Sequence, residues 1–120
     1  MRVRSAVVDT IEACFVRPLD ADAEETWLTP GCGLIFEELQ NFYGEGLSEG
    51  LWAVALLLCS LAKGGTCLDL ATLKDLPELD RLPDSLRDWD ASQWANAFSC
   101  IKDAKGVQPL TLRGTRLYFD

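Results

Sequence analysis

The segment from Gly50 to Ala62 (GLWAVALLLCSLA) constrains the fold more than any other feature of this chain. Apolar residues occupy every side of the helix that it would form, and such a helix has to be enclosed by other elements. Ser48 is a good N-cap for this helix, and Lys63 and Gly64 place a cation and a glycine at its end. The run is well short of the roughly 20 residues that cross a bilayer. We therefore expect a buried central helix and no membrane anchor.

Three shorter helices are expected before this central one, because apolar residues recur with helical spacing between cap and stop signals. Their ranges are about 3–16, ended by Pro18; from Asp20 or Asp22 through Leu28, ended by Pro30; and about 34–46, ended by Gly44 or Gly46. The first half of the chain is therefore predicted to be helical.

The apolar period changes after Gly65. The expected order is a short strand over 66–70, one or two helical turns in ATLKDL, a surface connection with a brief helix in ELDRLPDSLRD, and a helix from Asp90 to near Gly106. The last of these helices begins with the capping-box spacing of Asp90 and Gln93. Its predicted buried stripe consists of Trp94, Ala97, Phe98 and Ile101.

The closing residues PLTLRGTRLYFD alternate apolar and polar side chains on both sides of Gly114, which predicts a β-hairpin. The turn centres on Arg113-Gly114 or on Gly114-Thr115. Either choice places the same four residues on one face, so the register does not depend on the turn type. These residues are Leu110, Leu112, Leu117 and Phe119.

Together these elements predict an α+β fold: one domain over residues 1–120, mainly helical, with a small antiparallel sheet that ends in the hairpin. The second half has the element order of a winged-helix domain, in which the helix before the hairpin enters the major groove of DNA. A winged-helix DNA-binding domain is therefore an alternative function. That helix, however, contains no arginine and few side chains suited to base edges.

The charge distribution opposes nucleic-acid binding. Eleven basic and nineteen acidic residues give a net charge of −8, and residues 18–62 contain eight acidic residues and no lysine or arginine. Such a chain is a poor DNA binder unless a small basic patch works against the rest of the field. The acidic half is either a solvated face that maintains solubility or a docking surface for a basic partner protein.

No catalytic, cofactor or metal residues are predicted. The chain has no histidine, no phosphate-binding loop and no closely spaced cysteine pair, so its five cysteines are expected to be reduced core thiols. The pairs Glu24-Glu25 and Glu37-Glu38 do not face one another on a helix and are expected to be surface charge. Trp52 and Trp94 lie in apolar stripes and are expected in the core. Trp27 and Trp89 lie near polar stretches and are the candidate partner-interface residues.

Three segments resemble the N-terminal domain of RecD, the alpha subunit of exodeoxyribonuclease V: FVRPLDAD, LWAVALLLCSLAKGGTCLDLATL and the closing hairpin, in the same order. RecD is a 5′ to 3′ DNA helicase subunit of the RecBCD complex in double-strand break repair and recombination. The resemblance implies a non-catalytic assembly domain that docks the motor domain of the same polypeptide onto a RecC-like subunit.

The resemblance also implies that ATP and Mg²⁺ belong to the motor domain, whose ATPase motifs have no counterpart in this sequence. It implies a cytoplasmic protein with little or no direct nucleic-acid binding. In the family the hairpin leads straight into the motor, so a chain that stops at Asp120 is expected to stop at the domain boundary.

Overall fold

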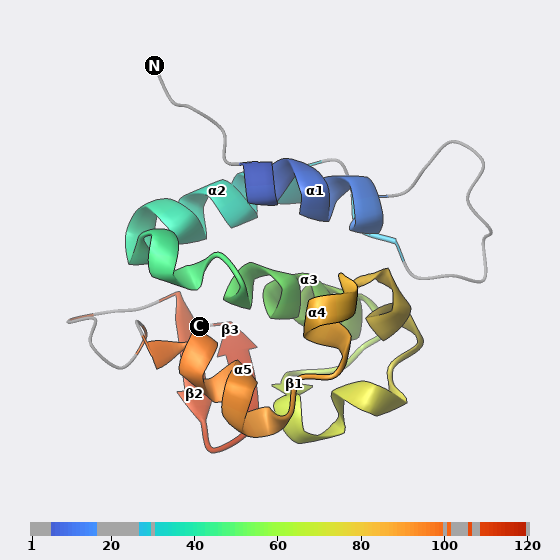
Figure 1. Ribbon diagram of the computed structural model, residues 1–120. Helices are drawn as coiled ribbons and strands as arrows, with labels where there is room; N and C mark the ends of the chain where they lie inside the picture. Colours follow the sequence, from blue (N-terminus) through green and yellow to red (C-terminus); the bar gives the residue numbers. More distant parts are fainter. Residues whose placement is uncertain are drawn as a thin grey trace.

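Helix α3 (Gly50–Ala62) lies in the middle of the molecule, between two helices on one side and the sheet with its short helices on the other (Figure 1). The computed structural model describes residues 6–16, 27–29, 31–99, 101, 106 and 109–119. Nine of the thirteen residues of α3 are buried, which confirms the predicted central helix. Over the described ranges, no helix is both long and apolar enough to cross a membrane.

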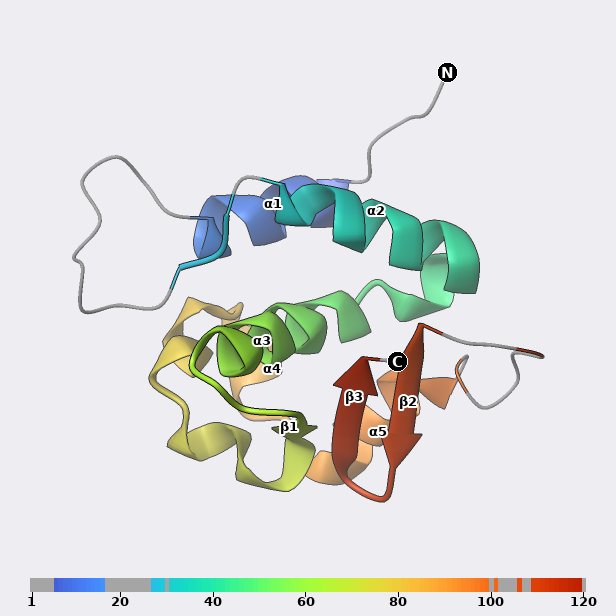
Figure 2. The ribbon, with the colours of Figure 1, turned by 180° about the vertical axis from the view of Figure 1, so that it is seen from behind.

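Helices α1 (Ala6–Phe15) and α2 (Cys32–Tyr43) form one layer and both pack on α3, as Figure 2 shows from behind. Each buries residues at helical spacing, so its inward side is apolar. The buried residues are Val8, Ile11 and Phe15 of α1 and Cys32, Gly33, Phe36 and Leu39 of α2. Both predicted helices are confirmed, with residues 3–5 outside the described ranges. Of the two predicted ends of this helix, Gly44 and Gly46, the structure has Gly44, whose φ is 83°.

The helix predicted to run through Leu28 is wrong at its described end. Leu28 is extended and forms an isolated parallel bridge with Val16, in which the Leu28 amide donates to the Phe15 carbonyl at 2.8 Å. The Leu28 side chain is buried, so tertiary packing on the core decides this conformation. Residues 17–26, where the rest of that prediction falls, are outside the described ranges.

Ser48 is not the N-cap of α3, contrary to the sequence prediction. A short 3₁₀ turn, η1 (Glu45–Leu47), leads into α3, whose cap position is Glu49 without a side-chain cap hydrogen bond. The Ser48 hydroxyl instead accepts a hydrogen bond from the Gln40 amide at 3.2 Å. Gly50 begins the helix in a crowded position, where a Cβ would lie 3.0 Å from atoms of Leu47 and Phe98.

The second half follows the predicted order of elements, which is the order of a winged-helix domain. Its elements are β1 (Leu68–Asp69), η2 (Leu70–Asp75), η3 (Pro77–Arg81), α4 (Asp84–Arg87), α5 (Ala91–Ala97), β2 (Leu110–Arg113) and β3 (Arg116–Phe119). The three strands form an antiparallel sheet in the order β1-β3-β2. The α+β class, mainly helical with a small antiparallel sheet, is confirmed.

The brief helix predicted in the segment ELDRLPDSLRD is present, since the segment contributes to η3 and contains α4. The segment is more buried than the surface connection that its charges and prolines predicted, because Leu82, Leu86 and the carboxylate of Glu78 lie in the interior. The Glu78 carboxylate is paired with the Lys63 ammonium at the end of α3. Pairing of a buried charge is what makes its burial possible.

Helix α5 begins with the predicted capping box. The Asp90 carboxylate accepts a hydrogen bond from the backbone N–H of Gln93 at 2.9 Å. The side-chain oxygen of Gln93 accepts one from the backbone N–H of Asp90, also at 2.9 Å. Trp94, Phe98 and Ile101 are buried as predicted, whereas Ala97 is half-buried. The helix breaks at Phe98, and its predicted end near Gly106 falls next to residues 102–105, which are not described.

The predicted hairpin and its register are confirmed. Leu110 pairs with Phe119 and Leu112 with Leu117, which places these four residues on one face. Of the two turns considered, the structure contains Gly114-Thr115, with Gly114 at a φ of 62°. Glycine is required there because L side chains rarely adopt that conformation.

Candidate functional site

The outward side of α2 carries three large apolar side chains that are exposed to solvent. Their exposed fractions are 66% for Leu34, 38% for Ile35 and 51% for Phe42. At 100° per residue, these positions fall within an arc of about 100° on the helix. They are the exposed large apolar residues of the described part of the chain. We call these three residues the α2 patch.

The α2 patch lies in an acidic environment. Glu38 is exposed and falls between Leu34 and Phe42 on the same arc of the helix, with Glu37 beside it. Asp9 is exposed on the neighbouring helix α1. Within residues 6–16, 27–29 and 31–62 there is no lysine or arginine. The layer therefore offers apolar contact area surrounded by negative charge.

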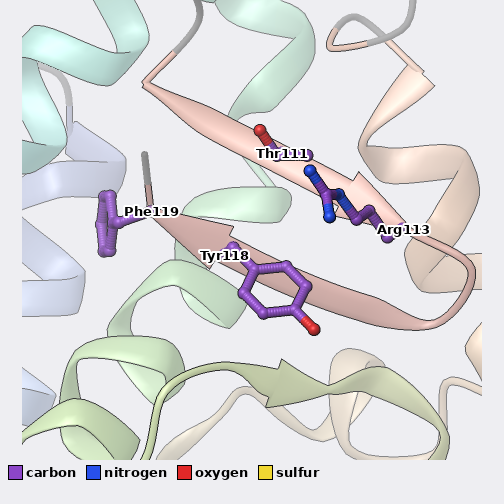
Figure 3. A pocket seen from close by; sticks show the side chains of 4 residues that line it. All are labelled: Thr111, Arg113, Tyr118 and Phe119. Carbon is purple, nitrogen blue, oxygen red and sulfur yellow. The ribbon is translucent and has the colours of Figure 1, made fainter.

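The hairpin presents the opposite kind of surface. Four residues alternate with the buried leucines and project from the other side of β2 and β3; we call them the outer sheet face, and they are Thr111, Arg113, Arg116 and Tyr118. Register places Thr111 opposite Tyr118 and Arg113 opposite Arg116. Figure 3 shows the Arg113 guanidinium lying along β2 towards Thr111, with the Tyr118 ring beside it on β3. A shallow depression of about 160 Å³ lies among Thr111, Arg113, Tyr118 and Phe119.

Asp69 ties the hairpin turn to β1. Its carboxylate accepts from the Ala71 amide at 3.0 Å and from the Thr115 hydroxyl at 2.8 Å, and these two hydrogen bonds lower the pKa of Asp69. Arg116 lies opposite Asp69 in the sheet and is hydrogen-bonded to the Tyr118 side chain, which raises the pKa of Arg116. A second open depression, of about 410 Å³, extends from Arg116 past Asp69 to Thr72 and Ser60.

The Cys59 thiol of α3 is buried and is not activated. Cys14, Cys32, Cys59 and Cys67 form no disulfide, and burial followed by the nearby Glu78 carboxylate raises the pKa of the Cys59 thiol to about 11. A thiol with that pKa is protonated and unreactive near neutral pH. Within the described ranges, no group of three or more histidine, cysteine, aspartate or glutamate residues could hold a metal ion.

A family model described as the N-terminal domain of the RecBCD enzyme subunit RecD matches residues 36–118, which is more than half of the chain. The chain belongs to this family. No curated protein and no solved structure matches it. The match begins inside α2 and ends in β3, so α3, the sheet and Phe42 belong to the RecD N-terminal domain as the family defines it.

Trp27, a predicted interface residue, precedes the part that matches the RecD model. It is half-buried, and the Arg81 guanidinium lies over its ring at 3.9 Å from the centroid, a cation–π contact. Its indole nitrogen is buried without a hydrogen-bond partner in the described part of the structure. The structure thus packs Trp27 against η3, and its contact with a partner stays a prediction.

Trp89, the second predicted interface residue of this RecD domain, is half-buried. Its ring meets that of Trp94 edge-on, with 4.8 Å between the centroids and 66° between the planes. The structure does not bring Trp27 and Trp89 into the α2 patch. Sequence reasoning missed the patch, although α2 has apolar residues on two sides, which is more than one buried stripe needs.

Proposed function

We propose that this chain is the non-catalytic N-terminal assembly domain of a RecD-like 5′ to 3′ DNA helicase subunit, the exodeoxyribonuclease V alpha chain. In this proposal it docks the ATP-dependent motor domain of the same polypeptide onto a RecC-like subunit in double-strand break repair. ATP and Mg²⁺ bind the motor domain, and this domain binds neither. Membership of the RecD family supports the proposal.

The observation that carries the docking proposal is the α2 patch. Large exposed apolar side chains that share one helix face are typical of protein–protein interaction sites. Phe42 contributes an aromatic ring, steadied by an edge-on contact with Tyr43 at 4.8 Å between centroids. Burial of Leu34 and Phe42 by a partner would remove from water the apolar surface that this layer leaves exposed.

The acidic residues around the α2 patch define the chemistry of the partner surface. A RecC-like subunit is expected to offer apolar side chains at the centre of the contact and lysine or arginine at its rim. Opposite charges at the rim steer association and discriminate against wrong partners more than they add affinity. Residues 31–62 supply glutamates and no cations, so the charge of this rim is uniform.

Binding of the 120-residue chain to the cognate RecC-like subunit, with its rates measured by surface plasmon resonance, tests this proposal. We expect Phe42→Ala to weaken binding by more than about 1 kcal/mol, roughly fivefold or more, because hot-spot aromatics lose at least that much. Glu38→Lys should slow association, whereas the matched charge reversal Asp88→Lys, at an exposed residue of α4's end, should not. No binding of the unaltered chain at micromolar concentrations, or equal binding by every variant, would contradict the proposal.

The alternative function, a winged-helix domain that reads duplex DNA, has the element order and the sheet order β1-β3-β2 in its favour. Its groove-entering helix would be α5. The exposed side chains of α5 are Ser92, Gln93 and Asn96, and the range 91–97 contains no lysine or arginine. A duplex reader draws much of its affinity from phosphate contacts, so the docking function is the better supported one.

A further inference from the structure

The outer sheet face holds two arginines at the turn end of the hairpin. Arg113 of β2 and Arg116 of β3 are cross-strand partners in the sheet. Both side chains are exposed. In the described structure no ion pair involves Arg113. Arg116 of β3 is the cross-strand partner of Asp69 of β1. Both guanidinium groups are therefore within reach of an anion that approaches this face from solvent.

The neighbouring side chains suit a phosphate-bearing ligand. Each guanidinium offers a planar set of N–H donors that fits phosphate oxygens in pairs. The Thr111 and Tyr118 side chains add hydroxyl groups on the same face, and the half-buried Tyr118 ring is available as a stacking surface. The open depressions on the two sides of β3, of about 160 and 410 Å³, leave room for an extended ligand across the strands.

We infer that the outer sheet face is a binding site for single-stranded nucleic acid. Arg113 and Arg116 contact successive backbone phosphates, and Tyr118 stacks on an unpaired base. A duplex is disfavoured because its bases are already stacked and because α5 offers no cation to a groove. This is the small basic patch that could act against the net charge of −8, and it is separate from the α2 patch.

The affinity is expected to be modest, because only two arginines face the strand and the rest of the molecule repels it. We place it within the usual non-specific range of about 10⁻⁴ to 10⁻⁶ M. Tyr118 should contribute as well, since base stacking on one aromatic side chain contributes about 1–3 kcal/mol, which corresponds to about 5- to 150-fold in affinity.

Fluorescence anisotropy of a labelled single-stranded thymidine oligomer, titrated with the 120-residue chain at about 50 mM salt, tests the inference. Arg113→Gln should weaken binding about eightfold and lower the salt slope by about 0.7, the value of one single-strand phosphate contact. Tyr118→Leu should weaken it at least about fivefold. The matched control Arg87→Gln removes one arginine that is paired with Asp84 in α4, and it should leave affinity unchanged.

Four outcomes would overturn the inference. The first is no binding of the oligomer at millimolar protein, and the second is a loss of affinity in Arg87→Gln as large as in Arg113→Gln. The third is equal affinity for a duplex of the same length. The fourth is displacement of the bound oligomer by an oligoglutamate peptide at the same concentration. The last outcome would mean that the site takes an acidic protein segment. Circular dichroism melting curves of each variant verify that the chain is folded, as expected for substitutions outside the hydrophobic core.

Discussion

The Cys59 thiol lies among charged groups without being activated by them. Burial is the main cause of its raised pKa, with the Glu78 carboxylate next, and Lys63 and Arg81 oppose the shift. Lys63 and Glu78 form an ion pair, and their charges shift the pKa of the thiol in opposite directions. Desolvation is therefore the main influence on the thiol. Cys59 is therefore a core residue of α3, although acid, base and sulfur are close together.

The raised pKa of Cys59 predicts an alkaline loss of stability. The folded thiol has a pKa of about 11 against an ordinary value of 9.0, so between these values the unfolded chain has lost a proton that the folded chain retains. Stability is thus fully present below about pH 9 and falls as the pH rises towards 11, by a few kcal/mol at most. Urea unfolding from pH 8 to pH 10.5 measures this change.

Cys59→Ala should remove this part of the fall in the free energy of unfolding between pH 8 and pH 10.5, whereas Cys14→Ala should retain it. Cys14 is half-buried on α1 and serves as the matched thiol control. If the free energy of unfolding falls equally with pH in both variants, other groups, such as lysines or tyrosines, cause the loss of stability.

At the scale of elements, one side chain joins α2 to the sheet. The Tyr43 hydroxyl accepts from the Leu110 amide at 3.2 Å and can donate to the Leu110 carbonyl at 3.4 Å. Leu110 is fully buried and begins β2, an edge strand. Tyr43 thereby satisfies backbone groups that an edge strand otherwise leaves without a partner.

Tyr43→Phe is expected to lower the free energy of unfolding by about 1–3 kcal/mol, because it leaves a buried amide and carbonyl unsatisfied. Urea denaturation followed by tryptophan fluorescence measures the change. Tyr118→Phe removes the same hydroxyl from the outer sheet face and should cost less, about 0.5 kcal/mol, as surface substitutions do. A loss of the same size in both variants would contradict the role assigned to Tyr43.

Local signals predicted the elements that local interactions determine. The capping box needs only Asp90 and Gln93, and the hairpin register needs only alternation around Gly114, so both were readable from the sequence. The conformations of Leu28 and of residues 77–88 depend on packing against distant parts of the chain. Buried Leu82 and Leu86 stand among charges and prolines, and no local pattern distinguishes them from surface leucines.

At the scale of the whole molecule, α3 is in contact with both layers, so its side chains belong to one continuous hydrophobic core. Leu57→Ala is expected to lower the free energy of unfolding by about 2–5 kcal/mol, because it leaves a cavity at a fully buried position. Both layers should unfold in the same transition. Far-ultraviolet circular dichroism and tryptophan fluorescence, recorded in one urea titration, measure this.

The control is Leu34→Ala, because Leu34 of α2 is 66% exposed. It should change stability by less than about 0.5 kcal/mol. Separate transitions for the two probes in either variant would mean that the layers are independent folding units.

The candidate surfaces were less predictable than the fold. The acidic half of the chain was visible in the sequence, but the α2 patch depends on which side of α2 faces α3. The two tryptophans drew attention by residue type, and the structure packs both partly inward. Arg113 and Arg116 became a possible site only through the observed turn at Gly114-Thr115, which places them opposite one another.

The sheet order has a consequence for how the chain is made. Strand β3 lies between β1 and β2, although it follows both in the chain. During translation β1 and β2 therefore leave the ribosome before the strand that both must pair with. The helical layer can begin to collapse early, but the sheet has to wait for the last strand to emerge.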